Sequence, residues 1–187
     1  MVSPYEKCPI YESEQYLLRF IEDADAPDLL AVYSDEKAVP YFNSDNCDGD
    51  FHCTLLEHVQ GMIEAWKWEY DRKGFVRWSI IEKNIHQAIG TIELFNRHAD
   101  DFFNDCGILR LDLRSDYEQE KNIFEILTLI LHPAFELFDC RMIATKIPHF
   151  ALERKAAIEQ LGFTASEEKL IGGHDGKIYT DYYILQR

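Results

Sequence analysis

The chain is short of basic residues: 19 Lys and Arg stand against 34 Asp and Glu, a formal net charge of -15 over 187 residues. A protein that binds nucleic acid needs a basic footprint for the phosphates, so this charge balance argues against a nucleic-acid partner. The same acidity suits a protein whose substrate carries positive charge.

Long apolar runs are also missing, because none reaches the roughly 20 residues that a membrane-spanning helix needs. Residues 1–15 contain no basic segment followed by an apolar one, so we expect no signal peptide. The five cysteines are odd in number and form no Cys-x-x-Cys pair, which is typical of reduced thiols. We therefore expect a cytoplasmic protein without a membrane partner.

The remaining composition is that of a folded domain. Hydrophobic residues make up 47% of the chain and aromatic residues 13%, which excludes a disordered protein. The length predicts one domain over 1–187, of which residues 1–15 form a polar leader. Apolar patterns predict about seven strands, at 16–21, 75–82, 88–95, 107–113, 141–147, 164–171 and 177–185. Helical spacing predicts a helix that begins at residue 25 and further helices at 54–70, 122–138 and 151–161. The predicted fold class is therefore mixed α/β (α+β) with one central sheet.

The centre of the chain is a strand, a polar turn and a long apolar helix, at 107–113, 114–121 and 122–138. A helix N-terminus carries unpaired N–H groups and a partial positive charge, so this order of elements predicts a seat for a phosphate group. The turn contains no glycine. Glu118 and Glu120 instead place negative charge there, which Lys121 offsets in part.

Several segments together resemble the GNAT superfamily of acetyltransferases, especially the branch that acetylates ribosomal-protein N-termini. They are the early strand with Arg19, the segments DADAPDLLAVYSD and VPYF, the strand AIGTIELFN with Gly90, the helix end IEQLGF, and Asp181 in the last strand. The resemblance covers about 16–185. It implies a strongly twisted sheet of about seven strands, splayed in the middle, with acetyl-CoA in the splay.

The resemblance also implies which residues bind acetyl-CoA. The backbone of Leu111 and Leu113 would contact the pantetheine arm, and a turn that includes Glu118, Lys121, Asn122 and Ile123 would hold the pyrophosphate. The family's glycine-containing pattern is absent from this turn, so its signature is degenerate. In the later helix, the positions of a common Asn and Ser are occupied by Ala151 and Arg154.

Two residues are candidates for catalysis. Glu93 lies on the strand that often carries a base in this fold, although an ordinary outward-facing carboxylate is the alternative. Tyr182 stands on the last hairpin, where it would donate a proton or simply pack on the sheet.

An acidic loop borders the expected acceptor site in the resembling family. Its carboxylates (Asp45, Asp48 and Asp50) would attract a cationic amine. Cysteines and histidines near it (Cys47, His52, Cys53 and His58) match no zinc spacing, so we expect no metal.

The main hypothesis is therefore an acetyl-CoA-dependent N-acetyltransferase, acting on a primary amine of a small molecule or of a peptide N-terminus. The alternative is a GNAT-fold binding protein that is catalytically inactive and has lost acetyl-CoA binding. A third possibility is that a different acyl donor or ligand occupies the cleft. For the assembly, we expect a monomer or a homodimer.

Overall fold

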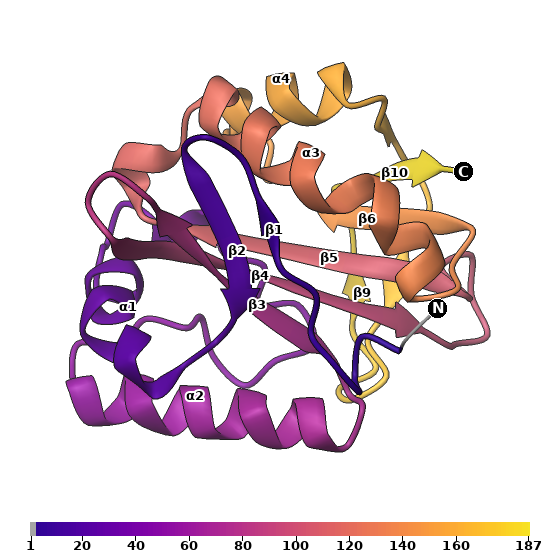
Figure 1. The fold of residues 1–187 in the computed structure, drawn as a ribbon. Coiled ribbons are helices and arrows are strands. Elements are labelled where there is room, and N and C mark those ends of the chain that lie inside the picture. The colour runs from indigo at the N-terminus through magenta and orange to yellow at the C-terminus, as the bar shows by residue number, and fades with distance from the viewer. Residues whose placement is uncertain (1–2) are drawn as a thin grey trace.

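The structure is a computed structural model that describes residues 3–187, and it is built around one sheet of eight strands in the order β1-β2-β3-β4-β5-β6-β10-β7 (Figure 1). The strands of this sheet are β1 (Tyr11–Glu12), β2 (Tyr16–Phe20), β3 (Val76–Glu82), β4 (Gln87–Arg97), β5 (Cys106–Leu113), β6 (Met142–Lys146), β7 (Thr164–Ala165) and β10 (Tyr182–Gln186). All neighbours pair antiparallel except β5 and β6, which are parallel. The expectation of a mixed α/β fold with one central sheet is confirmed.

Helices cover both faces of the sheet (Figure 1). One face packs against α1 (Ala26–Tyr33) and α2 (Leu56–Asp71), and the other packs against α3 (Glu120–Leu137) and α4 (Leu152–Gln160). Each face has its own apolar core. Burial of these two cores is the main force that holds the helices on the sheet.

The two-residue period of the strands decides which side chains enter which core. On β3, Val76, Trp78 and Ile80 belong to the core under α3, whereas Arg77 and Ser79 between them point to the opposite face. A polar residue on the α1–α2 face therefore follows Val76 and Trp78, whereas Ile80 is followed by a register shift and by the apolar Ile81. This alternation places a row of buried charges beneath α1 and α2.

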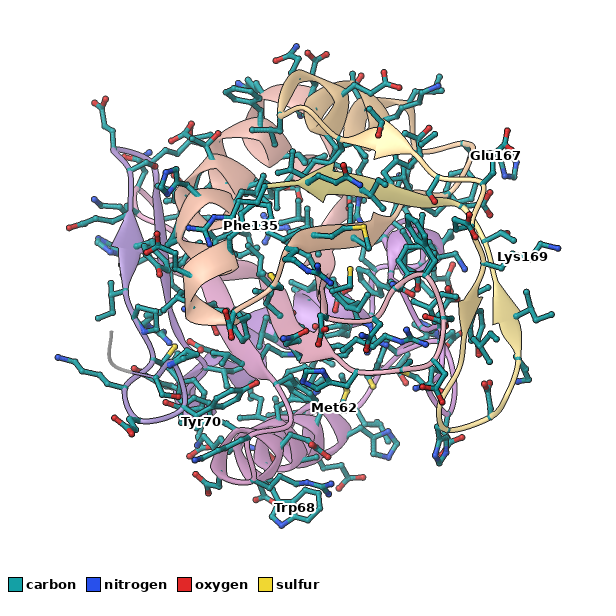
Figure 2. All side chains as sticks on the ribbon, turned by 90° about the vertical axis from the view of Figure 1, so that its right-hand side faces the viewer. Met62, Trp68, Tyr70, Phe135, Glu167 and Lys169 are labelled. Carbon is teal, nitrogen blue, oxygen red and sulfur yellow. The ribbon has the colours of Figure 1, made fainter. Side chains whose placement is uncertain are left out.

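At both ends of the chain the strands differ from those that the sequence pattern predicts. The described part of the polar leader, 3–15, contributes β1, and the indole of Trp78 donates a hydrogen bond to the Pro9 carbonyl at 2.8 Å. The last expected hairpin is divided, because Asp181 adopts a left-handed φ of 66° and interrupts the strand. As a result β8 (Leu170–Ile171) and β9 (Ile178–Tyr179) form a separate small sheet, visible near Lys169 in Figure 2.

Candidate active site

A wedge opens in the sheet where β5 and β6 separate. Their parallel pairing begins at Cys106 with Met142 and ends at Leu109 with Thr145, whereas β5 continues to Leu113. Where two neighbouring strands stop pairing and one of them continues, the backbone groups of the continuing strand lose their ladder partners on the side of the wedge.

The register with β4 identifies the backbone groups that face the wedge. The Arg114 N–H donates to the Ile89 carbonyl at 2.9 Å, one position beyond the Gly90–Leu113 pair, so the backbone of Arg114 points toward β4. Backbone groups alternate in direction along a strand, so those of Leu111 and Leu113 point away from β4 and toward the wedge. Both side chains are buried in the core beneath α3. Only their N–H and C=O groups are therefore placed to contact a ligand in the wedge.

The connection after β5 is tied to α4 by a buried ion pair. Nε of Arg154 donates to one carboxylate oxygen of Glu118 at 2.8 Å, and Nη2 donates to the other. Nη1 donates to the Tyr41 carbonyl at 3.1 Å. Arg154 is 3% exposed and Glu118 is 9% exposed. Arg154 therefore has three of its nitrogens engaged within the protein, across the end of the wedge.

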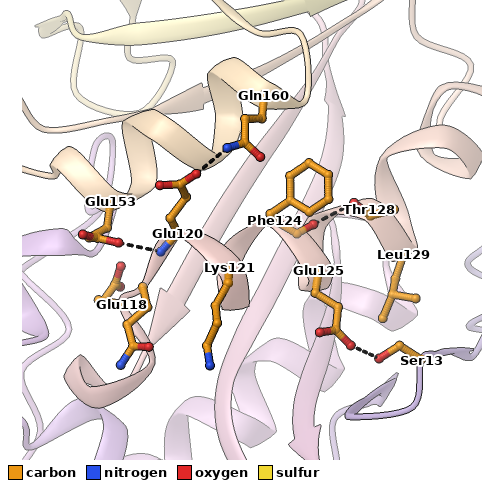
Figure 3. A pocket seen from close by; sticks show the side chains of 11 residues that line it. Ser13, Glu118, Glu120, Lys121, Phe124, Glu125, Thr128, Leu129, Glu153 and Gln160 are labelled. Carbon is orange, nitrogen blue, oxygen red and sulfur yellow. Dashed lines mark hydrogen bonds between the residues drawn. The ribbon is translucent and has the colours of Figure 1, made fainter.

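A carboxylate of α4 occupies the start of α3. The first helical N–H, that of Glu120, donates to the Glu153 carboxylate at 2.8 Å, and Gln160 donates to the side chain of Glu120 (Figure 3). An anion at this place is favourable because the helix N-terminus carries partial positive charge. The chain thus supplies its own anion to the seat that the sequence predicts for a phosphate.

These groups line a cavity of about 980 Å³ beside the first half of α3. Its charged lining residues are four carboxylates (Glu118, Glu120, Glu125 and Glu153) and the ammonium of Lys121. In Figure 3, Lys121 extends away from the contact between Glu120 and Glu153, and Glu125 accepts a hydrogen bond from Ser13 on the opposite side. The cavity is therefore predominantly acidic.

The other two expected turn residues have their N–H groups engaged. Those of Asn122 and Ile123 donate to the Gln119 carbonyl at 3.0 and 3.1 Å, and the Ile123 side chain is fully buried in the core. The Asn122 side-chain amide lies 3.5 Å from the Tyr117 carbonyl. In this conformation the backbone donors of Asn122 and Ile123 stabilise α3 itself, and their contact with a pyrophosphate stays a prediction.

A buried ladder of charges crosses the opposite face of the sheet. Arg77, Glu93 and Arg110 stand in register on β3, β4 and β5. The guanidinium of Arg77 donates to one carboxylate oxygen of Glu93, and that of Arg110 donates to the other at 3.0 Å. The Arg77 guanidinium also lies 4.1 Å from the ring centroid of Trp66 on α2, which is a cation–π distance.

The next row of side chains on the same face of β3, β4 and β5 is also polar. Arg77 donates to Thr91 at 2.9 Å and to Asp112 at 3.1 Å, and the hydroxyl of Tyr33 donates to Asp112 at 3.0 Å. Asp112 is 2% exposed. Asp112 is therefore held in a buried salt bridge with Arg77.

Glu93 has the environment of an anchored anion. Burial by itself raises the pKa of Glu93, but the guanidinium groups of Arg77 and Arg110 outweigh it and hold the pKa below its usual value. A carboxylate with both oxygens in ion pairs and a lowered pKa is a poor proton acceptor at neutral pH. The prediction that Glu93 is the general base is not tested, and this geometry favours a positioning role.

Tyr182 belongs to a second polar cluster, which Arg110 connects to Glu93. The Tyr182 hydroxyl donates to Asp45 at 3.2 Å, and the Lys146 ammonium contacts the other oxygen of that carboxylate at 2.6 Å. Arg110 donates to the Asp45 backbone carbonyl at 2.8 Å. Burial, and after it the Asp45 carboxylate, raises the pKa of Tyr182, so its hydroxyl stays protonated at neutral pH. A cavity of about 160 Å³ lies against this cluster.

The structure therefore brings Glu93 and Tyr182 into one network and separates them from the turn that carries Glu118 and Lys121. Sequence reasoning missed the roles of Arg77, Arg110 and Glu153. The first two carry a usable signal, because each is a charged residue inside an apolar strand and faces Glu93 from a neighbouring strand. Glu153 gives no comparable signal, since acidic residues are common in the first turn of any helix.

Acetyl-CoA fits this site only in part. The wedge-facing N–H and C=O groups of Leu111 and Leu113 suit the amides of a pantetheine arm. The diphosphate does not fit, because the first N–H of α3 already binds Glu153 and the guanidinium of Arg154 already binds Glu118. The acidic lining of the cavity would also repel it.

Residues 3–187 contain no group of three or more His, Cys, Asp or Glu side chains that could hold a metal ion. The same residues contain no helix with the length and apolar character needed to cross a bilayer.

Comparison with known proteins agrees with this geometry. Residues 15–164 match the family model described as an acetyltransferase (GNAT) domain. A relative in Bacillus subtilis strain 168, the uncharacterized N-acetyltransferase YoaA, is 30% identical over 84 residues, which span 45% of this chain and 44% of the relative. The matched region is therefore less than half of that protein.

Solved structures with the same fold include the following two. One is the ribosomal-protein-S5-alanine acetyltransferase from Vibrio fischeri, with a TM-score of 0.70, 16% identity and 96% of each chain covered. The other is Mycobacterium smegmatis RimJ in complex with CoA-disulfide, with a TM-score of 0.67, 12% identity, and 91% of this chain and 81% of that chain covered. At such low identity these likenesses concern the fold alone.

Proposed function

Because this chain belongs to the GNAT acetyltransferase family, whose members are acyltransferases, we propose that it is an N-acetyltransferase. In this proposal it transfers an acetyl group from acetyl-CoA to a primary amine of a small molecule or of a peptide N-terminus. The observation that carries the proposal is the wedge between β5 and β6. There the backbone groups of Leu111 and Leu113 face a gap in the sheet instead of a neighbouring strand.

The cluster at the other end of the wedge supports an amine as the acceptor. Asp45 already pairs with the primary ammonium of Lys146, so the cluster holds a cationic amine, and the exposed side chain of Asp48 adds negative charge on the same loop. Tyr182 is held against Asp45 with its hydroxyl protonated, so its part is to donate a hydrogen bond or a proton and not to accept one. Glu93 holds Arg110, which in turn holds the loop at Asp45.

The setting of the reaction is also a proposal. All five cysteines are free thiols, which suits a reducing compartment such as the cytoplasm. The proposed partner is the amine substrate alone, with the protein a monomer or a homodimer and with no part for nucleic acid or membrane. The acidic composition agrees with a cationic acceptor.

The test is an acetyl-transfer assay with a panel of amines, comprising peptides with free N-termini and small polyamines, with products detected by mass spectrometry. We compare Tyr182→Phe with Tyr183→Phe, because the two residues are adjacent on β10 and only Tyr182 contacts Asp45. We expect Tyr182→Phe to lower kcat/KM at least about tenfold, the lower end of what a positioned acid contributes, and Tyr183→Phe to leave it unchanged. Equal effects would remove Tyr182 from the mechanism.

A second candidate function is a GNAT-fold binding protein without catalysis. The Glu118–Arg154 ion pair and the Glu153 carboxylate favour it, since together they close the place of the diphosphate. Calorimetry with acetyl-CoA separates the two functions. Absence of binding up to millimolar acetyl-CoA, together with no acetylated product, would favour the binding protein.

A further inference from the structure

We propose that the wedge takes a pantetheine thioester by its arm alone and that the nucleotide diphosphate contributes no affinity; this inference rests on the proposed N-acetyltransferase function. The ligand class is then any acyl-pantetheine, of which acetyl-CoA is one member with its nucleotide left outside. Three features of the protein oppose a diphosphate: the state of the donors at the start of α3, the guanidinium beside them, and the charge around both.

Three of the first four backbone donors of α3 are already engaged. Of the first helical N–H groups of α3, that of Glu120 donates to the Glu153 carboxylate at 2.8 Å. Those of Asn122 and Ile123 donate to the Gln119 carbonyl. A diphosphate arriving here must displace a carboxylate that is held in place by its own helix, so it exchanges one anion for another and gains little.

The nearest guanidinium is not available either. Arg154 binds both oxygens of Glu118 and also the Tyr41 carbonyl, and both members of the ion pair are buried. If Arg154 turned to a diphosphate, Glu118 would be left as a buried, unpaired carboxylate, which is strongly unfavourable. The ion pair therefore keeps Arg154 from binding a diphosphate at this end of the wedge.

The charge of the cavity also disfavours binding of a diphosphate. Its lining includes four carboxylates, and Lys121 is the one basic residue among the residues that line it. A diphosphate brings more negative charge into this acidic surrounding. The pantetheine arm is uncharged and needs only hydrogen-bonding partners such as the backbone of Leu111 and Leu113, so none of these obstacles applies to it.

The experiment compares pantetheine with CoA, both as free thiols under reducing conditions, by calorimetry and by the NMR shifts of the Leu111 and Leu113 amides. In the unaltered protein we expect the two dissociation constants to agree within about threefold, and both ligands to shift these two amides. Glu153→Ala frees the first N–H of α3 and should tighten CoA binding about fivefold while leaving pantetheine binding unchanged. The matched control is Glu159→Ala, which removes the same charge from the exposed side of α4 and should change neither.

Three results would overturn the inference in distinguishable ways. If CoA binds the unaltered protein more than about tenfold tighter than pantetheine, the diphosphate is recognised and only this inference fails. If Glu153→Ala and Glu159→Ala act alike on CoA, the contact with Glu120 is not what weakens the diphosphate, and again only this inference fails. If neither ligand binds or shifts the two amides, the wedge does not hold a pantetheine arm, and the proposed function fails with it.

Discussion

The buried ladder on β3, β4 and β5 makes a sharp prediction about stability. Glu93→Gln keeps the shape of the side chain but leaves Arg77 and Arg110 buried without their shared counter-charge. Breaking a buried ion pair from one side costs about 3–5 kcal/mol. A domain of this size is stable by only about 5–15 kcal/mol, so the loss should be a large part of the total.

The pKa of Glu93 gives this prediction a pH dependence. Because the folded-state pKa lies below the unfolded value of about 4.3, the ion pairs contribute fully above that pH. Their contribution is lost as the pH falls through the folded pKa. The gap between the two proteins should therefore be widest at pH 7 and should narrow as the pH is lowered below about 4.

The assay is equilibrium urea unfolding at several pH values, with Glu159→Gln as a control in an exposed pair whose N···O distance is 3.8 Å. The control should change the free energy of unfolding by less than about 1 kcal/mol. A loss below about 1 kcal/mol for Glu93→Gln at pH 7, or a gap that is the same at acid pH, would refute the argument.

Two further predictions concern the other ion pairs. Glu118→Gln and Arg154→Met should each lower the free energy of unfolding by about 3–5 kcal/mol, and the double variant should lose less than the sum; additive losses in urea unfolding would show that the pair is not coupled. Lys146→Met should free the Asp45 carboxylate and lower the KM for a cationic acceptor about threefold, whereas Lys155→Met, in the exposed pair with Glu159, should not. A KM that rises or stays constant in steady-state assays of Lys146→Met would separate Asp45 from acceptor binding.

Local pattern was enough to predict the elements around the site. Alternation and helical spacing are properties of consecutive residues, so the strand that became β5, the turn and the helix that became α3 follow from the sequence. The same alternation placed the side chains of Leu111 and Leu113 on one face. The start of α3 lies two residues earlier than predicted, at Glu120, where Glu153 of another helix provides the anion at its N-terminus.

Partners that are distant in sequence could not be predicted in the same way. Arg154 reaches Glu118 across 36 positions and Lys146 reaches Asp45 across 101, because helices and strands separated in the chain are packed together. The Arg77–Glu93–Arg110 ladder depends on the register of three strands, and a slip of one residue would turn each side chain to the other face.

The sequence by itself thus determined the family fold, the order of elements and the absence of glycine from the turn. Only the tertiary structure decided that the turn's negative charge is paired with Arg154 and that a carboxylate from α4 occupies the helix N-terminus. It also decided that Glu93 is an anchored anion. The physical reason is that a residue's charge follows from its own side chain, whereas its counter-charge and its burial depend on the residues that the fold packs against it.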